Sequence, residues 1–192
     1  MPDEDPAPFA NFIPIPKELH SCETGAPFAN CVECEKPLLA DGTPYLIQKA
    51  FKGSETLVEY AHCFDCYDAL ASSYSKKTLN DISDFFLDAV NLEERKAELA
   101  KTASHSFAPW VSSCLTCGTL REKTASYTLL AQCDGPDMAL IYLPYMICET
   151  CQIEISERMS RESKDIWDRW LEENLDMPPS ARLDIRDGLI VD

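Results

Sequence analysis

The sequence predicts an α+β protein built from two similar modules in tandem. Three observations carry this prediction. Eight of the ten cysteines form four Cys-x-x-Cys pairs, the pairs recur in a second copy at nearly constant separation, and both copies show the same order of extended and helical patterns. The chain has 192 residues, which is enough for one medium domain or two small modules.

The paired cysteines point to metal binding. In a chain without a secretion signal, thiols at this spacing are more often metal ligands than disulfides, because the cytosol keeps thiols reduced. Two such pairs complete the tetrahedral set that zinc takes. We therefore expect two structural zinc ions per chain, with iron as the alternative metal. The expected ligands are Cys31, Cys34, Cys63, Cys66, Cys114, Cys117, Cys148 and Cys151.

The pairs repeat along the chain. Cys31 corresponds to Cys114 in the second copy, and Cys63 corresponds to Cys148 at a slightly larger separation. The extra length of the second copy must fall between its two pairs, where both copies carry turn-forming residues. These turns lie at 52–55 and 134–137.

The similarity continues beyond the last cysteine of each copy. Ser75 aligns with Ser160 and, after one more insertion or deletion, 81–82 aligns with 165–166. The pattern indicates an internal duplication of approximately 31–92 and 114–176.

Each copy reads as a cysteine turn, a β-hairpin and a helix. Runs rich in β-branched and aromatic residues predict the hairpins. The second cysteine pair of each copy opens a helix, where free backbone N–H groups and the helix dipole stabilise thiolates. The extended runs are 45–51 with 56–61, and 127–132 with 138–146.

This order of elements resembles the treble-clef type of zinc finger, in which a turn supplies two ligands and the start of a helix supplies two more. The resemblance covers about 31–75 and 114–160. It implies a zinc site in each copy and no particular activity, because the fold group serves many functions.

A further amphipathic helix is expected after each module. Its apolar stripe can cover the hairpin of its own copy or pack against the other copy. Because a module of ~60 residues has a marginal core, we expect metal and packing between copies to hold the fold together. The stripes are Ile82, Phe85, Phe86, Ala89 and Val90, and Ile166, Trp167, Trp170, Leu171 and Leu175.

The chain divides into five parts. Prolines forbid regular structure over most of the first part, which we expect to be an extended arm. The expected parts are the arm 1–30, the first module with its helix 31–92, a connector 93–113, the second module with its helix 114–176, and a tail 177–192.

Three residues stand outside the paired frame. Cys22 and Cys133 have no partner at short spacing and are expected to be buried or partly buried thiols. A third metal site, made by Cys22 with His20 or by Cys133 with His105, is the alternative. His62 could replace Cys63 as a ligand, but four cysteines already fill the site. We therefore expect His62 to be an ordinary residue of the hairpin.

The balance of charges excludes several classes of partner. The 33 Asp and Glu outnumber the 17 Lys and Arg, which gives a formal net charge of −16. Such a chain is repelled by nucleic acid and by anionic membranes.

No apolar run approaches the roughly 20 residues that a bilayer span needs, and the start has no signal-peptide pattern. We expect a cytoplasmic protein with a protein partner, no direct nucleic-acid contact and no membrane.

The function that the sequence favours is non-enzymatic. A closed four-cysteine site leaves no open position for water, so the zinc would support a protein–protein interaction or regulatory module. One alternative is a component of a nucleic-acid-associated assembly, which needs an exposed cluster of cations such as Lys49, Lys52, Lys76 and Lys77. The other is an enzyme with a pocket between the copies that holds Cys133 with His105 or His62.

Overall fold

The computed structural model describes residues 11–103 and 106–176, which form a mixed α+β structure with one six-stranded sheet. The strands are β1 (Asn11–Pro14), β2 (Pro44–Lys52), β3 (Glu55–Cys63), β4 (Ser126–Asp134), β5 (Asp137–Leu140) and β6 (Tyr145–Cys148). The helices are α1 (Phe64–Ser73), α2 (Lys76–Ala89), α3 (Leu92–Ala103), α4 (Glu149–Arg158) and α5 (Arg161–Asn174). Within the described residues, no helix is both long and apolar enough to cross a bilayer.

Both halves of the chain contribute to the same sheet. Its strand order is β1-β5-β4-β2-β3, and β6 also pairs with β4. The central pair is β2 with β4, which run antiparallel with Ile47 opposite Ala131 and Gln48 opposite Leu130. Since β2 and β4 are the first strands of the two predicted hairpins, the halves meet along matching elements.

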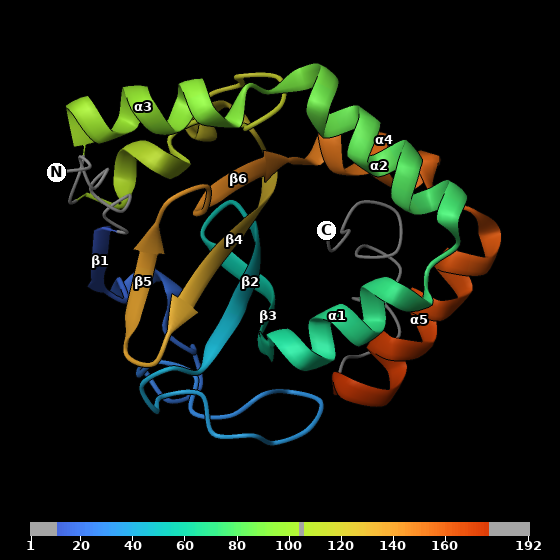
Figure 1. Cartoon of the computed structure of the whole chain (residues 1–192), viewed down its shortest axis with the longest axis horizontal. Helices are drawn as coiled ribbons and strands as arrows, with labels where there is room; N and C mark the ends of the chain where they lie inside the picture. The colour runs from blue at the N-terminus through green and yellow to red at the C-terminus, as the bar shows by residue number, and fades with distance from the viewer. Residues whose placement is uncertain (1–10, 104–105, 177–192) are drawn as a thin grey trace, which may run out of the picture.

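The helices α1, α2, α4 and α5 lie on one side of the sheet, to the right in Figure 1. The second helix of each half packs on a strand of the other half: the ring centroid of Phe86 in α2 lies 6.4 Å from that of Tyr145 in β6, and that of Trp170 in α5 lies 5.2 Å from that of Tyr60 in β3. Trp167 and Trp170 are both buried. The expected packing between halves is therefore present, and both tryptophans belong to the core.

The helices of the two halves match in length and spacing. Ser75 caps the start of α2, and Ser160 caps the start of α5. The C-caps Val90 and Leu175 follow these serines at the same distance along the chain. The prediction of an insertion or deletion between these positions is therefore wrong. The two helices have the same length and the same spacing from their capping serines.

The N-termini of α2 and α5 meet and share their capping groups. The backbone N–H of Ser75 donates to Ser163 Oγ at 3.0 Å, and that of Ser160 donates to Thr78 Oγ1 at 2.9 Å. Each serine also caps its own helix through its side chain. Thr78 and Ser163 are fully buried, so each helix is fixed by a residue of the other half.

The strands of the second half differ from the hairpin that the sequence predicts. The run 138–146 is not one strand: β5 pairs mainly with β1, and β6 pairs with β4 next to the second cysteine pair. Pro144 lies just before β6 and has no N–H to donate to a ladder, which explains why the strand is interrupted there.

The predicted N-terminal arm is partly built into the fold. Its residues 11–14 form β1 at the edge of the sheet, although the strand ends on Pro14 and Pro16 follows soon after. Ile15 and Leu19 are buried in the core, and Phe12 keeps 48 % of its surface exposed. Residues 1–10 lie outside the described part of the chain, as does the predicted tail 177–192.

Candidate metal centres

The first cluster joins a tight turn to the start of a helix. Cys31 and Cys34 lie in the turn before β2, whereas Cys63 ends β3 and caps α1, and Cys66 lies in the first turn of α1. Their four sulfur atoms all lie within 4.8 Å of one another. Cys34 is the exposed member of the set.

The second cluster has the same construction. Cys114 and Cys117 lie in a turn before β4, Cys148 ends β6 and caps α4, and Cys151 follows in the first turn of that helix. These four sulfur atoms also lie within 4.8 Å of one another, and Cys117 is the exposed one. The structure therefore brings together all eight predicted ligands, in the predicted two sets of four.

The dimensions of both clusters suit a tetrahedral metal ion. The sulfur atoms of Cys34 and Cys63 are 3.7 Å apart, and those of Cys117 and Cys148 are 3.6 Å apart. A tetrahedron with metal–sulfur bonds of ~2.3 Å has sulfur–sulfur edges of about 3.8 Å. A disulfide would need sulfur atoms ~2.05 Å apart. The spacing fits four thiolate ligands around one ion and does not fit disulfides.

Backbone N–H groups support the thiolates in the same way in both clusters. The N–H of Cys63 donates to Cys31 Sγ at 3.4 Å, and the N–H of Cys148 donates to Cys114 Sγ at 3.4 Å. Such bonds favour the charged form of the sulfur, which is the form that binds metal.

The pKa values of the thiols follow one pattern in the two clusters. Burial raises the pKa of the helix thiols, which is about 11 for Cys148 and still higher for Cys66 and Cys151. Burial also opposes ionisation of Cys117, but hydrogen bonds from the Thr119 hydroxyl and backbone lower its pKa to about 6. A hydrogen bond from the backbone of Lys36 likewise lowers the pKa of Cys34. In each metal-free cluster the exposed thiol therefore ionises more readily than the two thiols at the helix start, whose thiolates a bound cation would stabilise.

The two cysteine turns share a residue position with a left-handed backbone conformation. Glu35 has a positive φ of 59° and its N–H donates to the Cys31 carbonyl, while Gly118 has a φ of 70° and its N–H donates to the Cys114 carbonyl. A left-handed conformation costs a non-glycine residue roughly 1–2 kcal/mol. The second turn avoids this cost and the first does not.

Exchanging these residue types should therefore move stability in opposite directions. We expect Glu35→Gly to raise the free energy of unfolding by about 0.5–1 kcal/mol and Gly118→Ala to lower it by about 1 kcal/mol. Apart from its chain neighbours, no atom lies within 4 Å of a Cβ placed on Gly118. The effect of Gly118→Ala on stability therefore reports the backbone conformation alone. Denaturant unfolding of metal-loaded protein measures both values. A loss of stability in Glu35→Gly would contradict the assignment.

A polar contact that the sequence did not reveal ties the first cluster to α5. Glu33, which lies between Cys31 and Cys34, accepts a hydrogen bond from the indole N–H of Trp170 at 2.8 Å. The same carboxylate oxygen lies 3.0 Å from His62 Nε2. Partial burial opposes ionisation of Glu33, but the bonds from Trp170 and His62 lower its pKa. Nothing in the sequence around Glu33 indicates that its partner, Trp170, lies more than a hundred residues away.

His62 is a hairpin residue, as expected, and its ring is buried beside the first cluster. Burial lowers its pKa, which favours the neutral imidazole. Glu33, His62 and Cys66 can bring their ligand atoms within 4.8 Å of one another, so they form a further potential donor group that shares Cys66 with the first cluster.

The two unpaired cysteines differ from each other. Cys133 is buried, and burial raises the pKa of its thiol to about 12. Cys22 is exposed, which corrects the expectation of a buried or partly buried thiol; its sulfur lies 3.5 Å from Lys49 Nζ. Neither belongs to a potential metal-binding group among the residues that the structure describes. His20 instead contacts the carbonyls of Ile15 and Gly25, and His105 lies outside the described residues.

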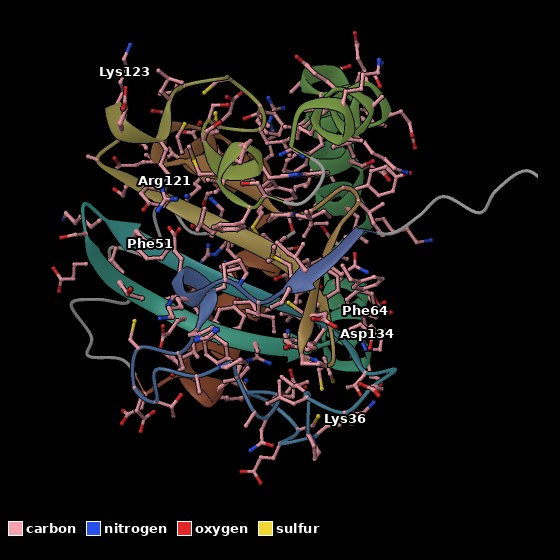
Figure 2. All side chains as sticks on the ribbon, turned by 90° about the vertical axis from the view of Figure 1, so that its left-hand side faces the viewer. Lys36, Phe51, Phe64, Arg121, Lys123 and Asp134 are labelled. Carbon is pink, nitrogen blue, oxygen red and sulfur yellow. The ribbon has the colours of Figure 1, made fainter. Side chains whose placement is uncertain are left out.

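The cations needed for a nucleic-acid surface are not gathered together. Lys49 is buried, with its Nζ 2.7 Å from Glu59 and 2.6 Å from the carbonyl of His20. Lys77 pairs with Asp81 on α2. Figure 2 shows Lys36 and Lys123 at opposite ends of the molecule in that view. The proposed group Lys49, Lys52, Lys76 and Lys77 therefore does not form one exposed patch.

Comparison with known proteins adds no further assignment. No protein-family model matches the chain, and no curated protein or solved structure matches it.

Proposed function

We propose that the protein is a non-enzymatic interaction or regulatory module whose fold depends on two structural zinc ions. The observation that carries this proposal is the pair of clusters, each with four cysteine sulfurs at tetrahedral spacing. Four protein ligands complete the coordination of zinc and leave no position for a reacting water. Zinc is preferred over iron because a closed thiolate site needs no redox chemistry.

We further propose that the two halves are tandem modules of treble-clef type that arose by duplication. The matched caps and lengths of α1 with α4 and of α2 with α5 support this proposal, as does the pairing of β2 with β4. The interrupted strand between β5 and β6 is the main difference between the halves.

The side chains weighed for catalysis do not favour an enzyme. The register places Cys133 opposite Tyr45, whereas His62 lies opposite Leu46, the next residue along β2. Successive residues of a strand face opposite sides of a sheet, so Cys133 and His62 lie on different faces. The raised pKa of Cys133 makes its thiol a poor nucleophile at neutral pH.

The charge of the chain suggests how a partner would be recognised. With a formal net charge of −16, the protein would steer a basic protein surface towards itself and repel nucleic acid. The alternative partner surface is apolar and would contact the exposed ring of Phe12 on β1.

Affinity capture with the metal-loaded chain tests this proposal. We expect a protein partner whose association rate falls steeply as salt rises from 50 to 300 mM, and no submicromolar binding to duplex or single-stranded nucleic acid at about 150 mM salt. The chelator-treated chain is the control, because a fold-dependent contact should disappear with the metal. Binding that does not change with salt concentration and is lost in Phe12→Ser would favour recognition through the apolar surface. Submicromolar nucleic-acid binding would overturn the proposal.

A further inference from the structure

An apolar groove of about 240 Å³ lies between α1 and α2. Positions i, i+3 and i+7 of each helix line it, so one face of each helix forms a wall. The side chains that define these walls are Tyr67, Leu70, Tyr74, Leu79, Ile82 and Phe86. Leu79 keeps 39 % of its surface exposed, although apolar side chains surround it.

The chain carries a suitable occupant directly after α5. Residues 177–192 include five large aliphatic side chains, namely Leu183, Ile185, Leu189, Ile190 and Val191. Near its C-terminal end, α5 contacts His62 through Trp170, with ring centroids 5.1 Å apart. A ligand atom of His62 lies within 4.8 Å of that of Cys66, the residue before Tyr67 in the groove wall. Leu175, the C-cap of α5, is buried in the core. The chain therefore leaves α5 close to the groove.

The reach of this segment and the volume of the groove suit docking. The eight residues from Leu175 to Leu183 can span up to about 26 Å when extended, at ~3.3 Å per residue. A cavity of ~150 Å³ holds one benzene molecule, so the groove takes a few aliphatic side chains and not a whole protein face.

We propose that the groove between α1 and α2 is a peptide-docking site and that segment 183–191 of the same chain occupies it. In an extended segment, Leu183 and Ile185 point to the same side and enter the groove together, while Asp184 faces water.

Site-specific photo-crosslinking in the full chain tests this docking. A benzoylphenylalanine replaces Leu79 at the rim of the groove, or Leu87 of the same helix, which is 74 % exposed and does not line the groove. We expect the probe at position 79 to form a crosslink within one chain to a peptide from 177–192, at a yield at least fivefold above that of the probe at position 87. Crosslinks between two chains, or none to this segment, would overturn the proposal.

Substitutions in the segment provide a second measurement. With the probe at position 79, Leu183→Asp combined with Ile185→Asp should reduce the crosslink at least fivefold. Arg186→Gln leaves every aliphatic side chain of the segment in place and should not reduce it. An unchanged yield in the double variant would show that these side chains do not enter the groove. Circular dichroism melting verifies that each variant is folded.

Discussion

Replacing Cys66 with serine is expected to remove the metal from the first cluster and to lower the melting temperature by about 10 °C or more. Apparent zinc-binding energies in small zinc-finger peptides are ~10–16 kcal/mol, and each kcal/mol shifts the melting temperature of a chain this size by about 2–4 °C. Because both halves share one sheet, we expect a single unfolding transition that moves as a whole.

Native mass spectrometry of protein purified without chelator measures the metal content directly. The unmodified chain should carry two zinc ions, and Cys66→Ser should carry one. Cys22→Ser is the matched control, because Cys22 is exposed and belongs to neither cluster; its melting temperature should change by no more than about 2 °C. Equal shifts in the two variants, or four disulfides in place of metal, would contradict the metal assignment.

Replacing Glu33 with alanine should destabilise the protein by about 1–3 kcal/mol without releasing either metal. The substitution leaves the indole N–H of Trp170 and the Nε2 of His62 without their shared acceptor, and both side chains are buried. A buried donor that loses its partner costs about 1–3 kcal/mol. Glu33 keeps about a third of its side chain exposed, so water replaces part of the lost contact.

Glu35→Ala is the control that distinguishes the loss of this contact from the loss of a negative charge. Glu35 lies in the same turn and is exposed, so its replacement changes the charge equally without affecting Trp170. Denaturant unfolding compares the two variants, and tryptophan fluorescence reports the surroundings of Trp170. If Glu33→Ala and Glu35→Ala are equally stable, Glu33 does not join α5 to the first cluster.

The sequence predicted the elements whose signals are local. Cysteine spacing identified all eight members of the two clusters, because ligands in a tight turn and at a helix start have a fixed spacing. Runs of β-branched and aromatic residues located β2 and β3 to within two residues at each end. The cysteines at 63 and 148 located the starts of α1 and α4.

Features that depend on distant partners could not be read in the same way. The strand β5 exists where β1 pairs with it, and an isolated run of apolar residues does not reveal this partner. Lys49 looked like a surface cation, but Glu59 and the His20 carbonyl hold its ammonium in the interior. The contact of Glu33 with Trp170 likewise depends on how α5 crosses the first half.

The pairing of β2 with β4 has a consequence for the order of folding during synthesis. The ribosome completes β2, β3, α1 and α2 before residues 126–134 exist, so β2 can pair with β3 while its other edge stays open. An open strand edge is a template for association with other chains. The nascent first half must therefore remain incomplete until β4 closes that edge, and Ser160 and Ser163 join the capping groups of α2 later still.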